Sequence, residues 1–283
     1  SNNTAVGHNS LTANTTGVNN VAVGFAALGA NTVGEDNIAI GAYALDGASS
    51  SSTTQTIAIG KEAASGALAG HNNICIGYQS LLVATSAFQN TAVGNLTLKA
   101  LTTGDENVAI GYGALVANTS ASYNVAVGMQ TLLANTTGAE NTAVGYRALV
   151  ANTTGTKNVA MGSSSLDECT TGDFNTAVGT SALTSVTTSD NNTAVGYSAG
   201  LEITTGAGNT AVGTSAMATN TTGANNVAVG WIALTTNSTA SNNTAVGRSA
   251  LAANTTGADN TAVGMQALNT NSTGASNTAV GYT

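Results

Sequence analysis

One glycine recurs through the whole chain at a fixed interval, and this interval limits what the chain can fold into. The glycine occupies positions 7, 24, 41, 60, 77, 94, 111, 128, 145, 162, 179, 196, 213, 230, 247, 264 and 281. Every step is 17 residues except the 19-residue step from Gly41 to Gly60. A short fixed period predicts a repeat array in which each unit stacks on its neighbours. The two additional residues fall in the Ser/Thr-rich stretch 49–56, where we expect a loop insertion.

The residues before this glycine predict a short β-strand. They are Thr, Val or Ile, then Ala, then Val, Ile or Met, a run typical of a strand that ends at Gly. Side chains alternate along a strand, so the Ala side chain lies on one face and the two larger side chains lie on the opposite face. Ala fills this slot in sixteen of seventeen copies, and Cys75 fills the other. We interpret the small face as the surface that packs against another subunit. The candidate packing residues are Ala5, Ala22, Ala39, Ala92, Ala143, Ala177, Ala211, Ala245 and Ala279.

Asparagine precedes the strand in sixteen of seventeen copies, with Thr56 as the exception. In stacked coils each such amide lies above the amide of the preceding coil, so it can hydrogen-bond to the next copy and to turn backbone. Asn also tolerates the left-handed backbone of turns, and the two roles are compatible. We expect a structural ladder.

The segment after the glycine carries a small residue at the third place and Leu at the fourth. It predicts either a second short strand or a helical turn, and we favour a strand or irregular extended backbone. The seventh place is often Asn, but Leu101, Cys169, Val186 and Ile203 replace it. These apolar replacements indicate that the slot points inward. A Thr-Thr-Gly sequence, as at 153–155, then turns the chain back.

These slots together predict one coil per repeat. The expected fold is all-β: a parallel β-solenoid, or β-roll, of about seventeen 17-residue coils in a single domain over residues 1–283. The absence of proline agrees with a parallel sheet, whose interior strands need every backbone N–H.

Composition excludes several functions. The chain has five Lys and Arg and a net charge of -8, which argues against a nucleic-acid partner, and no apolar run is long enough for membrane insertion. His8 and His71 lie nearly four repeats apart, so no catalytic set converges, and we expect no enzyme activity, metal or cofactor. Cys75 and Cys169 are about 25 Å apart at about 4.8 Å per coil, beyond disulfide reach, and we interpret both as buried small hydrophobes, with a link between chains as the alternative.

Eight of the thirteen carboxylates lie in the turn just before the Asn slot. They are Glu35, Asp36, Asp105, Glu106, Glu140, Asp173, Asp190 and Asp259. As a stripe they could hold Ca²⁺, but they occur in fewer than half of the coils and lack the glycine-rich calcium repeat. We favour a solvated turn edge.

The slot immediately after the strand glycine is the most variable of the repeat. Seven of the eleven aromatic residues occupy it: Phe25, Tyr78, Tyr112, Tyr146, Tyr197, Trp231 and Tyr282. Variability within a rigid array predicts solvent exposure, and an exposed aromatic row can stack on sugars or on a receptor. Packing over a coil corner or between subunits is the alternative for this candidate binding row.

The strand motif, as in NTAVG, resembles the NSVAIG-type repeats of trimeric autotransporter adhesin heads. The longer phrase NTAVGYRALVANTTG resembles repeat tracts of phage and bacterial tail-fibre-type proteins. The resemblance covers the whole chain and implies a left-handed β-roll, intertwined or packed as a homotrimer, in a secreted, cell-surface or virion-borne fibre. It therefore implies a structural fibre, stalk or adhesin segment with a possible glycan or receptor partner.

Two further expectations complete the sequence reading. Both ends show an ordinary repeat strand without a polar cap, so we expect a segment of a longer fibre or end-to-end stacking. The alternative function is ice binding, because a flat and nearly uncharged solenoid with Thr ladders could order water. Against it, the strand Thr is interrupted by Val and Ile and is followed by Ala.

Overall fold

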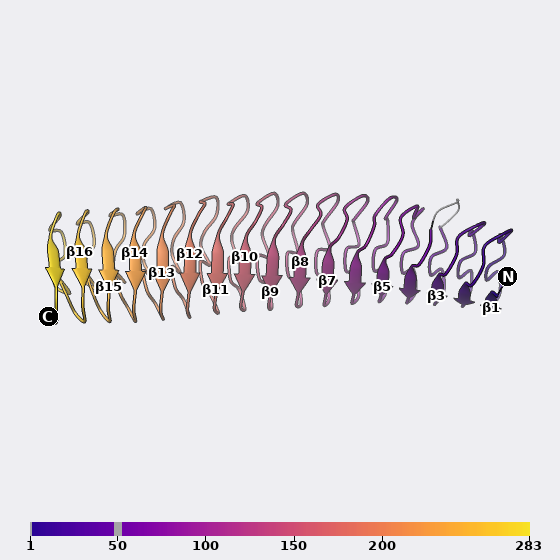
Figure 1. The fold of residues 1–283 in the computed structure, drawn as a ribbon, viewed down its shortest axis with the longest axis horizontal. Helices are drawn as coiled ribbons and strands as arrows, with labels where there is room; N and C mark the ends of the chain where they lie inside the picture. Colours follow the sequence, from indigo (N-terminus) through magenta and orange to yellow (C-terminus); the bar gives the residue numbers. More distant parts are fainter. Residues whose placement is uncertain (1, 48–52) are drawn as a thin grey trace. The chain divides into compact units, whose positions relative to one another are not determined.

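The computed structural model describes residues 2–47 and 53–283 (Figure 1). Its contacts divide the chain into two compact units. Unit 1 is Ser1–Asn141 and unit 2 is Thr142–Thr283. Residues 49–52 of the expected loop insertion lie outside the described residues, which include its end, 53–56. The described parts of the chain contain β-strands and turns but no helix, and so none that could cross a membrane.

Each unit is built from three-residue strands, one for each repeat. In unit 1 they are β1 (Thr4–Val6), β2 (Val21–Val23), β3 (Ile38–Ile40), β4 (Ile57–Ile59), β5 (Ile74–Ile76), β6 (Thr91–Val93), β7 (Val108–Ile110) and β8 (Val125–Val127). In unit 2 they are β9 (Thr142–Val144), β10 (Val159–Met161), β11 (Thr176–Val178), β12 (Thr193–Val195), β13 (Thr210–Val212), β14 (Val227–Val229), β15 (Thr244–Val246), β16 (Thr261–Val263) and β17 (Thr278–Val280).

Neighbouring strands within a unit pair in parallel, with each residue opposite its equivalent in the next repeat. In unit 2, for example, Ala177 of β11 lies opposite Ala194 of β12, which in turn lies opposite Ala211 of β13. The shift is one repeat at every step, so each coil stacks directly on the last. Both units are therefore parallel β-solenoids, which confirms the predicted all-β fold and its 17-residue coil.

The middle residue of each strand points into the coil. Ala22, Ala39, Ala92, Ala143, Ala177, Ala211 and Ala245 are fully buried, whereas Ala5 is exposed and Ala279 half-buried in the first and last strands. The interior also holds the Leu slot, as at Leu183. The expectation that the Ala face packs against another subunit is therefore wrong. The slot must be small because the other side of the same narrow coil faces it.

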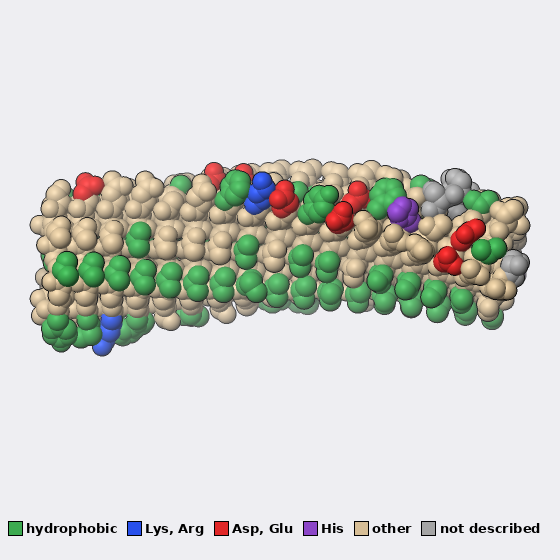
Figure 2. Space-filling view, viewed as in Figure 1, with side chains coloured by type: hydrophobic (Ala, Val, Ile, Leu, Met, Phe, Trp, Pro, Cys, Tyr) green, Lys and Arg blue, Asp and Glu red, His purple; other side chains and the backbone are tan. Residues whose placement is uncertain are grey.

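The first and third residues of each strand point out of the coil, and we call this surface the outer strand face. Its side chains are half-buried or exposed, with Val195 39% exposed and Met161 44% exposed. Figure 2 shows hydrophobic side chains in a row along the strands. No residue of any strand is charged.

The Leu-bearing segment forms consecutive turns, so the favoured strand or extended backbone is wrong. In the coil that begins at Gly179, Ala182 N–H donates to the Gly179 carbonyl at 3.3 Å, and Val186 N–H donates to the Leu183 carbonyl at 3.4 Å. Ser181 and Leu183 both have left-handed backbone, with φ of 57° and 51°. The Leu183 N–H donates to the Ala199 carbonyl of the next coil at 3.0 Å. Hydrogen bonds between coils thus hold turns that the isolated segment would not favour.

Asparagines form the predicted ladder inside the coil. Asn209 Nδ2 donates to the Gly223 carbonyl at 2.9 Å, across the same coil, and to Asn192 Oδ1 of the preceding coil at 3.2 Å. Asn209 Oδ1 accepts from the backbone N–H of Asn226 in the next coil at 3.0 Å. The same pattern recurs in unit 1, as between Asn90 and Asn107. The seventh slot also points inward, as predicted, since Leu101 and Ile203 are fully buried.

Candidate functional site

The candidate binding row lies in the slot that follows the strand glycine, and the structure exposes its side chains as predicted. The exposed fractions are 44% for Phe25, 42% for Tyr78 and 52% for Tyr112 in unit 1, and 47% for Tyr146, 60% for Tyr197, 49% for Trp231 and 69% for Tyr282 in unit 2. Whether the row binds anything stays a prediction.

The backbone around this row is held in place by hydrogen bonds between coils. Ser215 N–H donates to the Tyr197 carbonyl at 2.9 Å, and Ser249 N–H donates to the Trp231 carbonyl at 3.0 Å. The strand glycine before each row residue adopts a φ near 130°, for example 136° at Gly196. The backbone is therefore fixed while the side chain remains free to vary, which explains why this slot can hold different residues.

Several row side chains contact one another from coil to coil. In unit 1, His8 stacks on Phe25 with ring centroids 5.4 Å apart, and Phe25 also meets Tyr43, one slot beyond the row, edge to face at 5.2 Å. In unit 2, the Arg248 guanidinium lies over the Trp231 ring, 4.9 Å from its centroid. Figure 2 shows a basic side chain among hydrophobic ones along the lower edge of unit 2. The solenoid thus brings row residues 17 apart in sequence into direct contact.

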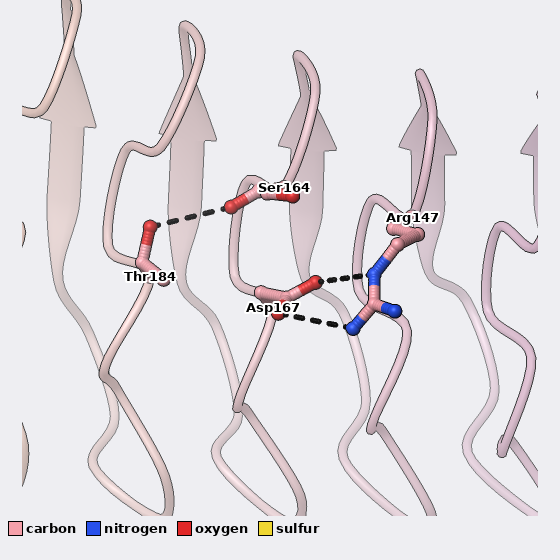
Figure 3. Close-up of polar contacts among 4 residues, drawn as sticks. All are labelled: Arg147, Ser164, Asp167 and Thr184. Carbon is pink, nitrogen blue, oxygen red and sulfur yellow. Dashed lines mark hydrogen bonds and ion pairs between the residues drawn. The ribbon is translucent and has the colours of Figure 1, made fainter.

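Cations on and next to the row differ in their partners. Lys61 Nζ lies 3.5 Å from Glu62 Oε1. Arg147 Nε and Nη2 donate to the two carboxylate oxygens of Asp167 in the next coil at 3.4 Å each (Figure 3). This hydrogen bonding, together with the Asp167 charge, raises the pKa of Arg147 above its ordinary value. Arg248 has no carboxylate within ion-pair distance among the described residues.

Carboxylates of the turn edge accept hydrogen bonds from the neighbouring coil, and three of them accept from backbone N–H groups. Asp173 Oδ1 accepts from the Thr156 N–H at 2.6 Å, and Asp190 Oδ1 accepts from the Asp173 N–H at 2.7 Å. Asp105 Oδ1 accepts from the Phe88 N–H at 2.8 Å in unit 1. No three His, Cys, Asp or Glu side chains gather in metal-binding geometry within residues 2–47 and 53–283.

Both cysteines are buried free thiols, as predicted. Desolvation raises the pKa of Cys169 to about 11, and full burial raises the pKa of Cys75 well above its ordinary value. A raised pKa leaves little thiolate near neutral pH, so neither sulfur is a nucleophile in the folded chain.

Two exposed surfaces were missed by sequence reasoning. The first is the outer strand face: alternation separated it from the Ala slot, but the Ala slot was the one expected to pack against another subunit. The second is a row of Thr in unit 2, nine places after the strand glycine, which we call the Thr ladder. All its members are exposed: Thr154, Thr171, Thr188, Thr205, Thr222, Thr239, Thr256 and Thr273. The repeated Thr-Thr-Gly sequence was the available signal, but it was used only to predict a turn.

Comparison with protein-family models, with curated proteins and with solved structures finds no match to this chain.

Proposed function

We propose that this chain is a structural fibre, stalk or adhesin segment that assembles as a homotrimer, on a cell surface, on a virion or outside the cell. The observation that carries the proposal is the outer strand face. It is regular and without charge, its third-position row is apolar in both units, its first-position row is mostly Thr in unit 2, and a monomer would leave it partly in water. The exposed row beside it would be the surface that the assembled fibre presents to a glycan or receptor.

The size of the outer strand face supports association. The nine strands of unit 2 span about 38 Å at about 4.8 Å per strand. All nine of its third-position residues are Val or Met. In unit 1 both outer rows are almost wholly Val and Ile. Exposed apolar patches of several hundred Å² usually mark protein interfaces. The β-branched side chains are also stiff, so burying them loses little side-chain entropy.

The form of the face supports a closed assembly of identical copies. Every copy carries the same face, so copies can associate symmetrically about one axis and shield it from water together. The resemblance to trimeric adhesin heads and tail-fibre repeats favours three copies. An uncharged interface is also consistent with a chain of net charge -8, because the repelling carboxylates lie on other edges of the coil.

The proposal can be tested by polar substitution of the outer strand face. Val178→Gln, Val195→Gln and Val212→Gln together should convert a trimer into monomers while the circular dichroism spectrum is retained. The matched control places the same three changes on the Thr ladder, at Thr171, Thr188 and Thr205, and should stay trimeric. Analytical ultracentrifugation measures both. A monomeric wild type, or a substituted trimer as stable as the wild type, would overturn the proposal.

Ice binding remains a second candidate because of the Thr ladder. Eight consecutive coils of unit 2 carry an exposed Thr in the same slot. The Thr that precedes a ladder residue donates its hydroxyl to the next coil. Thr170 Oγ1, for example, donates to the Thr187 carbonyl at 3.1 Å, which fixes the surface beside the ladder. A rigid, uncharged array of hydroxyl and methyl groups is suited to ordering water. Thermal hysteresis that Thr188→Lys, Thr205→Lys and Thr222→Lys abolish would support it, and no hysteresis in the wild type would remove it.

A further inference from the structure

The Arg248 and Trp231 pair is the feature of the binding row that points to a particular ligand chemistry. The two residues occupy equivalent slots of adjacent coils, and the guanidinium lies 4.9 Å from the ring centroid. This contact with the indole restricts the Arg248 side chain, and no hydrogen bond or ion pair to the described residues occupies its N–H groups. Trp231 is still 49% exposed. On its other side the equivalent slot holds Thr214, a shorter side chain that leaves the indole accessible.

Arg248 also differs from the other two cations at this corner of the coil. Arg147 is held by Asp167 through two hydrogen bonds, and Lys61 lies beside Glu62. Arg248 has no such neighbour among the described residues. A guanidinium fork without a protein carboxylate is well matched to a ligand carboxylate, which it binds through two parallel hydrogen bonds.

Charge is distributed unevenly around the coil, and this favours an acidic ligand at the row. The slot after the strand glycine and the slot that follows it carry three of the five Lys and Arg residues but one of the thirteen Asp and Glu residues, Glu62. In unit 2 these two slots hold Arg147 and Arg248 and no acid. Asp259, the acid closest to Arg248 in sequence, accepts instead from Asn242 Nδ2 on the turn edge, at 3.1 Å. Although the protein is acidic overall, these two slots of unit 2 therefore favour the binding of an anion.

Aromatic residues extend the site on both sides. Tyr197 lies two coils before Trp231, and Tyr282 lies two coils after Arg248, so each is about 10 Å away along the stack at about 4.8 Å per coil. Both are exposed. Aromatic faces spaced along a straight edge suit an extended chain of sugar rings, since the apolar face of a sugar packs on an aromatic ring.

We propose that the corner of unit 2 from Tyr197 to Tyr282 binds an acidic polysaccharide, with a sugar carboxylate on Arg248 and sugar rings on Trp231 and the flanking tyrosines. This inference rests on the proposed adhesin role and deepens it by naming the ligand class. Polymers of uronic acids and of sialic acid share the required carboxylate. The matching neutral polymers lack it and should bind weakly.

The test uses the whole chain and a panel of immobilised polymers: polygalacturonate, alginate, polysialic acid and carboxyl-reduced polygalacturonate. The wild type should bind at least one acidic polymer at 0.15 M salt and bind the reduced polymer much more weakly. Arg248→Gln should weaken binding to that acidic polymer tenfold or more, and Trp231→Ser should do the same. The matched control is Arg147→Gln, which removes a cation that Asp167 already holds and should leave binding within about twofold.

The outcomes separate this inference from the proposed assembly. If the wild type binds no acidic polymer, or if Arg248→Gln binds as well as the wild type, the inference is wrong, and sedimentation still decides independently whether the chain is trimeric. Equal binding to the acidic and reduced polymers would also overturn it, because the carboxylate would then have no role. Far-ultraviolet circular dichroism and the thermal midpoint of each variant identify any change that comes from misfolding.

Discussion

At the scale of single residues, the strand glycine is required for two reasons. At Gly111 the backbone φ is 120°, a conformation that side-chain-bearing residues rarely adopt. A β-carbon placed there would also lie 2.6 Å from the Gly128 carbonyl oxygen of the next coil. The glycine therefore repeats because each coil approaches the next too closely for any side chain.

Gly111→Ala should lower the free energy of unfolding of unit 1 by about 1–3 kcal/mol from the backbone conformation alone, and by more from the contact. Gly113→Ala in the same coil is the matched control. Its slot holds side chains in other coils, as at Ser181, and the nearest atom, Leu133 Cδ1, would be 3.6 Å away. Urea unfolding followed by circular dichroism measures both, and equal midpoints would contradict the argument.

Asparagines at the two inward slots should differ in importance. Asn209→Leu leaves the Asn226 N–H without its acceptor, whereas the Gly223 carbonyl keeps the Asn220 amide and Asn192 Oδ1 keeps the backbone N–H of residue 209. A buried polar group without a partner costs about 1–3 kcal/mol, and we expect a loss of this size from the free energy of unfolding of unit 2.

Asn220→Leu provides the comparison for the ladder prediction. Its slot is apolar in other coils, as at Leu101 and Ile203, so the interior accepts such a side chain. The loss should be clearly smaller than for Asn209→Leu. Urea midpoints in the reverse order would show that the ladder of Asn209 is not the main polar support of the coil.

At the scale of the strand, alternation predicts two different faces but does not say which one is inside. The coil closes within 17 residues, and its Leu, Asn and strand side chains share one narrow interior. Only Ala or Cys fits there, so the larger Val and Ile are left outside. The fold class could be predicted because period and composition repeat in every coil. The inward face could not, because it depends on the width of the closed coil.

The turns after the strand show a second limit of prediction. Ser181 and Leu183 adopt left-handed backbone that their residue types do not favour. Hydrogen bonds to the coils on either side maintain it, and such bonds exist only after stacking. The candidate binding row was predictable because variability in one slot of a regular repeat indicates exposure. The pairing of Arg248 with Trp231 also follows from register, since they lie 17 residues apart.

Enlarging one strand residue should cost much more on the inward face than on the outer strand face. Ala194→Leu overfills the interior and should lower the free energy of unfolding of unit 2 by about 1–3 kcal/mol. Val195→Leu, on the outer strand face next to it, should change it by less than about 0.5 kcal/mol in a monomer. The two thermal midpoints distinguish the faces directly. If Val195→Leu proved the more damaging change, the assignment of the inward face would be wrong.

At the scale of the whole molecule, the chain consists of two units in which each coil contacts mainly its neighbours. Such arrays need not unfold in one step. The chain carries a natural reporter in each unit, because Cys75 is buried in unit 1 and Cys169 in unit 2. Their raised pKa values and burial should make both inert to a thiol reagent at pH 8 in the folded state.

Titration with urea in the presence of a thiol reagent should therefore report each unit separately. Cys75→Ala leaves Cys169 as the reporter of unit 2, and it introduces the residue found in this slot of every other repeat, so stability should change little. Cys169→Ala leaves the reporter of unit 1. Two different reaction midpoints would show independent unfolding, and coincident ones would show a single cooperative transition. Rapid labelling without urea would contradict the buried placement of the thiols.

The one-repeat register of the stacked strands has an evolutionary consequence. Because nearly every coil offers the next the same alanine, asparagine and glycine, an in-frame gain or loss of 17 codons leaves the remaining neighbours matched. Recombination between near-identical segments of the gene produces changes of this kind. The number of coils can thus change between lineages while the residues of the variable slot after the strand glycine change one by one. Selection can therefore act separately on the length of the array and on the residues that it exposes.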